Sequence, residues 1–342
     1  VDDRNDKEEF LNALPELAGK AYVVLIVRNQ MTLPFPSDIL QMTAVTVPML
    51  LAENKGLDPL DALRTIAITD GIPKLVQLFD FQRPFAENLG VLFTQNSTYF
   101  RYAESVLHRN FRTPETYNIL LYGMATGHNR ISQLAEFSGF PQNKCDKYLK
   151  ALDKAGLLET VQRKDITDHI RTHYYPKGGY WKTWFRYVFP SQGRCLKPLE
   201  GGNLQQLADD IDCAIVVEYF KKVCWQWMKK NYGDYYWDEV LRFDDPKQQN
   251  VTVNGVHFDY VQETKDHTIY VKIWDDIREG FPKAEFQKIE TVTTKNRPFY
   301  ENIYFLFSAG RACNYVEQLR NLETVAVVDL KSLLGQKNKE LF

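Results

Sequence analysis

The sequence predicts a mixed α/β protein, because its last third alternates strands with helices and its middle part combines short helices with a hairpin. Four apolar segments have the length and composition of strands: residues 256–261, 268–274, 303–308 and 324–329. Helical spacing of apolar residues covers residues 211–230 and 312–319. Strands that alternate with helices favour an α/β sandwich. At 342 residues, the chain is also too long for a single ordinary core.

Residues 113–175 combine three helical patterns with two strand-like ones. Thr113-Pro114 is a typical helix start, and Gly127 follows the first apolar helical face. The later patterns cover residues 131–137, about 142–155, 157–161 and 173–175. Three helices, a tight turn and a hairpin are how a winged helix-turn-helix presents one helix to the major groove of DNA. We therefore predict such a module over residues 113–176.

The positive charge of the chain is concentrated around this module. Between Arg109 and Lys197 the sequence holds 15 Lys or Arg and 7 Asp or Glu, a net charge of +8. The rest of the chain holds 27 basic and 37 acidic residues, a net charge of −10, so the overall −2 conceals two oppositely charged parts. A segment this basic favours a polyanionic partner.

The candidate DNA-binding residues lie on the third helix of the module and on its hairpin. They are Lys144, Lys147, Lys150 and Lys154, which recur at helical spacing, with Arg163, Lys164 and Arg171 on or beside the hairpin. Set against phosphates, these side chains would release counterions, so binding should depend on salt. The alternative interpretation is a solvated helix face on a module that docks onto protein.

Cysteine usage and hydropathy predict a cytoplasmic protein. The five cysteines are scattered and form no CxxC pair, which favours reduced, buried thiols over disulfides or a zinc site. No apolar run approaches the roughly 20 residues that cross a bilayer, and the N-terminus does not resemble a signal peptide. We therefore expect no membrane partner.

Residues 1–112 begin with an apolar run at 20–27, of the kind buried in a parallel sheet. Helical patterns follow at residues 37–52, 58–68, 73–81 and 84–109. The phosphate-binding motif GxxxxGK[ST] does not occur, and around Gly19-Lys20 a leucine and an alanine replace the first glycine and the magnesium-binding hydroxyl. This chain should not hydrolyse ATP, and ATP binding would require a domain upstream of Val1.

The order of these features resembles the C-terminal part of the archaeal-type ATPases, in the STAND branch of AAA-like ATPases. Residues 70–75, Asp-Gly-Ile-Pro-Lys-Leu, are similar to the family's GGIPxYL lid segment. Residues 117–158 are similar to its winged helix, and residues 184–190, Trp-Phe-Arg-Tyr-Val-Phe-Pro, to its aromatic connector. The resemblance covers roughly residues 60–335 and implies a restriction-endonuclease-like domain after the connector.

We therefore predict four folded segments and a tail. They are the end of a nucleotide-binding domain with a helical lid at residues 1–112, a winged helix-turn-helix at 113–176, an aromatic connector at 177–209, a restriction-endonuclease-like domain at 210–335 and a tail at 336–342. The connector's aromatic side chains either form a buried joint between domains or stack on bases, as in single-strand binders. We favour the joint.

The resemblance implies a nuclease site of the form D…(D/E)xK, with a glutamate on the preceding helix. In such a site, carboxylates on adjacent strands hold a divalent ion and the lysine polarises water or phosphate. In this sequence Asp259 is the first carboxylate, Lys272 the lysine and Glu218 the helical acid. Asp259 is thus the candidate metal ligand, and Mg²⁺ is the ion that it would take.

The second carboxylate of this pattern is missing, because Tyr270 stands two residues before Lys272. A tyrosine keeps its proton up to about pH 10 and is a poor magnesium ligand. Glu263 or Asp275 could substitute from a neighbouring position. The plainer interpretation is that Asp259 and Lys272 form a cross-strand ion pair. We favour a nuclease-like scaffold without catalytic activity.

Two functions from different classes follow from these patterns. The first is a non-catalytic DNA-binding and interaction protein, related to archaeal-type ATPases, with a basic winged helix and a degenerate nuclease-like domain. The alternative is an enzyme, either a metal-dependent nuclease or the C-terminal part of an ATP-dependent enzyme whose motor lies outside this chain. Tyr270 favours the first. We expect no cofactor in the chain and DNA as its partner; a protein partner or a second copy of the chain is an open alternative.

Overall fold

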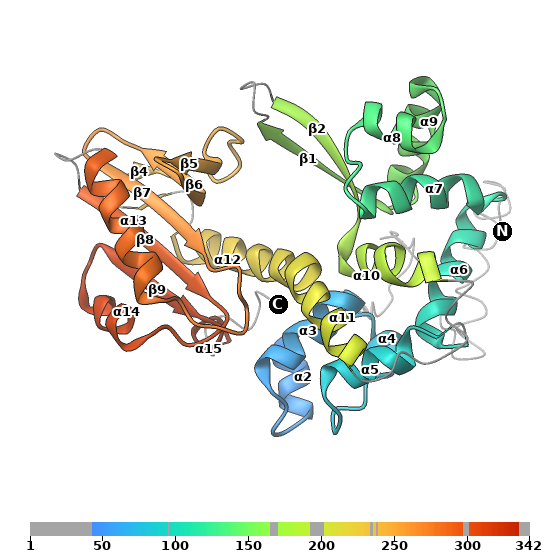
Figure 1. The fold of residues 1–342 in the computed structure, drawn as a ribbon, viewed down its shortest axis with the longest axis horizontal. Coiled ribbons are helices and arrows are strands. Elements are labelled where there is room, and N and C mark those ends of the chain that lie inside the picture. The colour runs from blue at the N-terminus through green and yellow to red at the C-terminus, as the bar shows by residue number, and fades with distance from the viewer. Residues whose placement is uncertain are drawn as a thin grey trace, which may run out of the picture. The chain divides into compact units, whose positions relative to one another are not determined.

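The computed structural model describes residues 43–94, 96–164, 170–191, 202–232, 235–236, 239–296 and 301–334. Those from Ala44 on belong to one compact unit of the chain. Its architecture is mixed α/β, as predicted (Figure 1). The predicted strand at residues 20–27, the first part of the helix predicted at 37–52, Cys195 and the tail at 336–342 lie outside the described residues.

Helices make up the first described part of the chain. They are α2 (Val47–Glu53), α3 (Pro59–Thr69), α4 (Pro73–Val76), α5 (Phe85–Leu92) and α6 (Thr98–Asn110). Side-chain caps start three of them, since Thr46, Asp58 and Ser97 accept hydrogen bonds from backbone N–H groups of the first turn. The helix predicted over residues 73–81 is a single turn. The pattern at 84–109 is two helices, because the second begins at its own cap, Ser97.

A module of three helices and a hairpin follows at residues 114–176, and we call it the helix–hairpin module. It contains α7 (Pro114–Ala125), α8 (Ile131–Ser138), α9 (Gln142–Lys154) and the antiparallel strands β1 (Leu158–Lys164) and β2 (Ile170–Pro176). Gly139 follows α8 with φ 70°, a left-handed conformation that glycine adopts without strain. Thr113 precedes α7, but its side chain does not cap the helix, unlike the sequence expectation.

The aromatic connector is buried, as the joint interpretation expected. It forms α10 (Gly178–Thr183), the π-helix η1 (Trp184–Val188) and the turn η2 (Phe189–Ser191). The side chains of Tyr180, Trp184 and Phe185 have no exposed surface. The backbone of Gly179 lies so close to α3 that a Cβ there would stand 1.7 Å from the carbonyl oxygen of Ala67. Bases therefore cannot stack on these rings while the connector keeps this packing.

A second junction ties α3 to the start of α10. The carboxylate of Asp70 accepts hydrogen bonds from the backbone N–H groups of Gly179 at 2.7 Å and Tyr180 at 3.1 Å. Burial raises the pKa of Asp70 to about 6, and the two backbone hydrogen bonds oppose that rise. Asp70 belongs to the segment that resembles a lid motif, and its carboxylate here binds the connector.

One long helical segment leads into the last part of the chain. It contains α11 (Gly202–Ile211), the π-helix η3 (Asp212–Val216) and α12 (Val217–Tyr232), and is followed by the short antiparallel pair β3 (Tyr235–Tyr236) and β4 (Glu239–Val240). Asp212 is 2% exposed and accepts from two nitrogens of the Arg64 guanidinium on α3. A buried ion pair therefore joins the first helices to this segment.

The last part is a five-stranded mixed sheet between helices. Its strands, in spatial order, are β5 (Gln249–Val253), β6 (Val256–Glu263), β7 (His267–Ile273), β8 (Glu301–Ser308) and β9 (Val325–Asp329). The pairs β5–β6 and β6–β7 are antiparallel, whereas β7–β8 and β8–β9 are parallel. The parallel pairs are connected through the helices α13 (Lys283–Asn296) and α14 (Asn314–Gln318), and the turns η4 (Leu319–Asn321) and α15 (Leu330–Leu333) precede and follow β9.

Apolar side chains cover both faces of this sheet. One face contributes Val271 and Phe305 to the core that contains Phe220 and Met228 of α12. The other face contributes Tyr270 and Tyr304 to a separate cluster with helices α13 and α14. The sheet is thus sandwiched between helices, which agrees with the predicted α/β layering. Among the described residues, no helix is long and apolar enough to span a lipid bilayer.

Candidate functional site

Helix α9 presents one buried face and one exposed basic face. Cys145, Leu149 and Leu152 are buried in the core of the module. The candidate lysines are all exposed, and we call them the α9 basic face: Lys144, Lys147, Lys150 and Lys154. Spacings of three and four residues place these side chains on one side of the helix. The helix therefore presents its positive charge to the surface.

Few acidic groups neutralise the α9 basic face. Lys150 forms an exposed ion pair with Asp146, one turn earlier, at 2.7 Å. The ammonium of Lys144 lies over the ring of Phe140, 4.3 Å from its centroid. Lys147 and Lys154 make no ion pair within the described parts of the chain. An anion that approaches this face therefore meets cations whose charge is largely uncompensated.

The hairpin places two arginines opposite each other. Arg163 of β1 is the register partner of Arg171 of β2, and both are exposed. The guanidinium of Arg163 also lies over the ring of Tyr175, 5.1 Å from its centroid. The backbone of Lys164 pairs with Ile170, and its side chain lies outside the described part of the structure.

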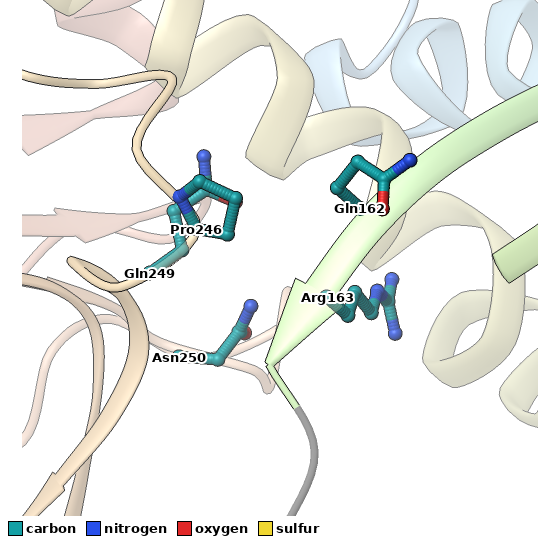
Figure 2. Close-up of a pocket in the computed structure, with 5 residues that line it drawn as sticks. All are labelled: Gln162, Arg163, Pro246, Gln249 and Asn250. Carbon is teal, nitrogen blue, oxygen red and sulfur yellow. The ribbon is translucent and has the colours of Figure 1, made fainter. Parts of the chain in front are cut away.

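A small cavity adjoins the hairpin. Figure 2 shows its lining residues on β1 and on the segment that leads into and forms the start of β5. The cavity has a volume of about 290 Å³. Its lining residues are Gln162, Arg163, Pro246, Gln249 and Asn250. One guanidinium and three side-chain amides are groups that hydrogen-bond to phosphates or bases. The cavity therefore extends the polar surface beside Arg163.

Glu218, the predicted helical acid, lies at the base of the hairpin rather than beside the sheet carboxylate. It forms an ion pair with Lys182 of α10 at 2.5 Å. Glu159 of β1 joins the same network through Lys222 at 3.0 Å and Lys182 at 3.7 Å. Burial alone would raise the pKa of Glu159, but the two lysines outweigh it and lower the pKa. This network connects the hairpin, the connector and α12.

The predicted metal ligand, Asp259, is bound by a lysine that sequence reasoning missed. Its side chain is 5% exposed, and one oxygen accepts from the Lys221 ammonium at 2.8 Å. The other oxygen accepts from the backbone N–H of Ile273 at 2.7 Å. Lys221 also contacts Asp275 at 3.0 Å. We call these three side chains, Asp259, Lys221 and Asp275, the Lys221 centre.

Burial and the charges of the Lys221 centre shift the pKa values of Lys221 and His257. Burial would lower the pKa of Lys221, but the charges and hydrogen bonds of Asp259 and Asp275 outweigh it and raise the pKa. Burial lowers the pKa of His257, Asp259 opposes that, and Lys272 and Lys221 lower it further. Lys221 is thus held as an ammonium ion beside two carboxylates.

Lys272 does not form the cross-strand ion pair that the sequence suggested. Its ammonium donates to the backbone carbonyl of His257 at 2.9 Å, while Asp259 binds Lys221. The ring of Tyr270 is 1% exposed and packs against Phe258, with centroids 5.0 Å apart. The position where the pattern requires a second acid is therefore part of an apolar core.

The two proposed substitutes for the missing acid differ in position. Glu263 is exposed and is the last residue of β6, where it pairs in register with Thr268 of β7. Asp275 shares Lys221 with Asp259. Within the described ranges, no group of three or more His, Cys, Asp or Glu side chains could hold a metal ion. Lys221 lies one helical turn after Glu218, but nothing in the sequence indicates that it contacts Asp259.

The cysteines agree only in part with the expected buried thiols. Cys145 and Cys224 are buried, Cys313 is partly buried and Cys213 is exposed; all four are free thiols. The prediction of burial was wrong for Cys213, which follows Asp212 in the π-helix η3. The four thiols form no disulfide with one another.

Comparison with known proteins adds little about chemistry. No family model matches the chain. An uncharacterized protein of Methanocaldococcus jannaschii is 27% identical over 126 residues, which are 36% of this chain and 28% of that protein. The match thus spans less than a third of the relative, and the name of that protein states no activity.

Proposed function

We propose that this chain is a non-catalytic DNA-binding and interaction protein, in which residues 113–176 act as a winged helix and α9 enters the major groove. The observation that carries the proposal is the α9 basic face, where exposed lysines lie opposite a buried apolar face of the same helix. A buried apolar face opposite a polar one is common to surface helices; what supports DNA binding is that four lysines share the exposed side of α9. Phosphates of duplex DNA would neutralise their charge.

The hairpin supports the same proposal. Arg163 and Arg171 are register partners on β1 and β2, and both side chains are exposed on the hairpin. In winged helices, the hairpin contacts the DNA backbone while one helix reads the groove. The proposal therefore assigns the hairpin arginines and Lys164 to the backbone, with α9 in the groove.

The sheet domain is proposed to be a nuclease-like scaffold that is catalytically silent. The order α12, β5–β6–β7, α13, β8, β9 supports a relation to restriction-endonuclease-like domains. Against catalysis stand the buried Tyr270, the backbone contact of Lys272 and the lysine bound to Asp259. The relation to archaeal-type ATPases, a cytoplasmic location and the absence of ATP hydrolysis by this chain belong to the same proposal.

The test is a salt titration of binding to short duplexes, followed by fluorescence anisotropy. We expect the association constant to fall steeply with salt for several unrelated sequences. Replacement of Lys144, Lys147 or Lys154 by Ala should flatten the logarithmic salt slope by about 1 for each phosphate that the variant no longer neutralises. Lys288 is an exposed lysine of α13, and Lys288→Ala serves as the matched control. Affinity that is indifferent to salt would contradict the proposal.

A further inference from the structure

We propose that Lys221 is a built-in cation, which fills the position that a divalent metal ion would take between Asp259 and Asp275. This inference deepens the proposed function and rests on it, because it explains why the nuclease-like site is silent. The supporting geometry is that one ammonium lies within 3.0 Å of an oxygen of each carboxylate, on two different segments of the chain. Carboxylate oxygens that converge on one point are the ligand set of Mg²⁺, Mn²⁺ and Ca²⁺.

The carboxylate of Asp259 is held by the backbone as well as by the lysine. Its second oxygen accepts from the N–H of Ile273 at 2.7 Å, and its residue is buried in β6. Removal of the lysine would leave this carboxylate oriented but without a cation. An ionised carboxylate that is 5% exposed is costly unless a positive charge accompanies it.

Asp275 supplies the adaptable half of the centre. Its side chain is 62% exposed, so it can shift to the shorter distances that a metal requires, and solvent can complete the coordination. An ammonium carries one charge and donates hydrogen bonds, whereas a divalent ion carries two charges and binds water. Lys221 therefore satisfies the acids and leaves no metal-bound water to be activated.

The experiment replaces the lysine by a neutral residue and measures metal binding directly. At pH 8, Lys221→Gln should bind one Mn²⁺ with a dissociation constant of about 1 mM or below, by electron spin resonance and calorimetry. Mn²⁺ should also raise its melting temperature, because a ligand that binds only the folded state stabilises it. The unchanged protein should show neither effect.

Two variants make the comparison specific. Lys222 is the next residue on α12 and pairs with Glu159 instead, so Lys222→Gln should gain no Mn²⁺ binding. The double variant Lys221→Gln with Asp275→Asn should lose at least tenfold of the affinity gained. If Lys221→Gln and Lys222→Gln respond equally to Mn²⁺, or if neither responds, the inference is wrong.

The variant is informative even if it unfolds without metal. Refolding would then be followed by circular dichroism with and without millimolar Mn²⁺ or Ca²⁺. Recovery of the helical signal with metal supports the inference, and failure of all ions to restore it overturns it. DNA binding through α9, and plasmid cleavage by the Lys221→Gln variant with Mn²⁺, test the proposed function instead. Cleavage would contradict a silent scaffold without contradicting the metal site.

Discussion

The α9 basic face and the Lys221 centre are two groups of charged side chains that differ in exposure and in ion pairing. On α9, the lysines are exposed, and Lys147 and Lys154 have no ion-pair partner within the described residues. In the Lys221 centre, the cation contacts two carboxylates, one of them buried. Uncompensated surface charge is available to a polyanion, whereas compensated charge in a partly dry site is already engaged within the fold. The difference teaches that function is best sought where charge is exposed and unmatched.

Mutations in the two regions should therefore change different quantities, DNA affinity in one and stability in the other. Substitutions among the lysines of the α9 basic face should alter DNA affinity and leave stability nearly unchanged. Substitutions among buried groups should alter stability and leave the affinity of the folded protein unchanged. Each prediction below tests one side of this division.

The largest effect is expected from a carboxylate placed in the apolar sheet face. Tyr270→Glu would restore the second acid of the sequence pattern, but Tyr270 lies between Phe258 and Tyr304, with ring centroids 5.0 and 5.8 Å away. We expect the free energy of unfolding to fall by about 3–5 kcal/mol, because the ring packing is removed and an acid is buried. Urea denaturation measures it. Tyr270→Phe, which keeps the ring, is the control. A Tyr270→Glu protein that is as stable as that control and binds Mg²⁺ would contradict the assignment of Tyr270 to an apolar core.

The next effect concerns the buried pair between α3 and η3. Asp212→Ala leaves Arg64, which is 14% exposed, with Asp61 as its remaining acidic partner. We expect a cost of about 3 kcal/mol in the free energy of unfolding, because a buried charge loses its partner. The exposed pair of Asp146 and Lys150 provides the control, since Asp146→Ala should not change stability measurably. Equal effects in the two variants would show that burial does not govern these pairs.

The third effect concerns DNA affinity alone. Reversal of two unpaired charges, Lys147→Glu with Lys154→Glu, should weaken duplex binding by about 100-fold at physiological salt, because attraction to phosphates becomes repulsion. The melting temperature should stay the same. The matched control reverses Lys288 and Lys295, on α13. If the control weakens binding as much, the effect reflects net charge rather than the α9 basic face.

The smallest effect is a pH dependence that originates at Asp70. Its pKa is about 6 in the folded protein and 3.8 as the reference value, so the folded state binds the proton more tightly. Stability contributed by this group is present below about pH 4 and is lost as pH rises through about 6. The free energy of unfolding should fall by about 1–3 kcal/mol over this range. The stability difference between Asp70→Asn and the unchanged protein, measured by urea denaturation from pH 4 to 8, should therefore shift in favour of the variant. A difference that is flat over this range would contradict the assignment to Asp70.

Much of the local structure could be predicted from the sequence. The helices of the module end where Gly139 and Gly156 allow left-handed backbone, and the apolar strands β6 to β9 lie close to their predicted bounds. Local signals suffice there because caps, glycines and apolar periodicity act within a few residues. Helix α13 was not predicted. Its run of Thr291 to Thr294 is rich in β-branched residues, which favour strands, and Phe286, Ile289 and Val292 pack the helix on the sheet.

The sequence by itself determined the mixed α/β class, the concentration of positive charge in the middle of the chain and the presence of Tyr270 two residues before Lys272, where the D…(D/E)xK pattern has an acid. The tertiary structure decided which helix residue reaches Asp259. Glu218 and Lys221 lie three residues apart on α12, so spacing along the sequence places both on neighbouring parts of the helix surface and does not decide which of them meets the sheet. Packing of Phe220 and Met228 sets which side of α12 meets the sheet. As a result, Lys221 faces the carboxylates and Glu218 faces the hairpin.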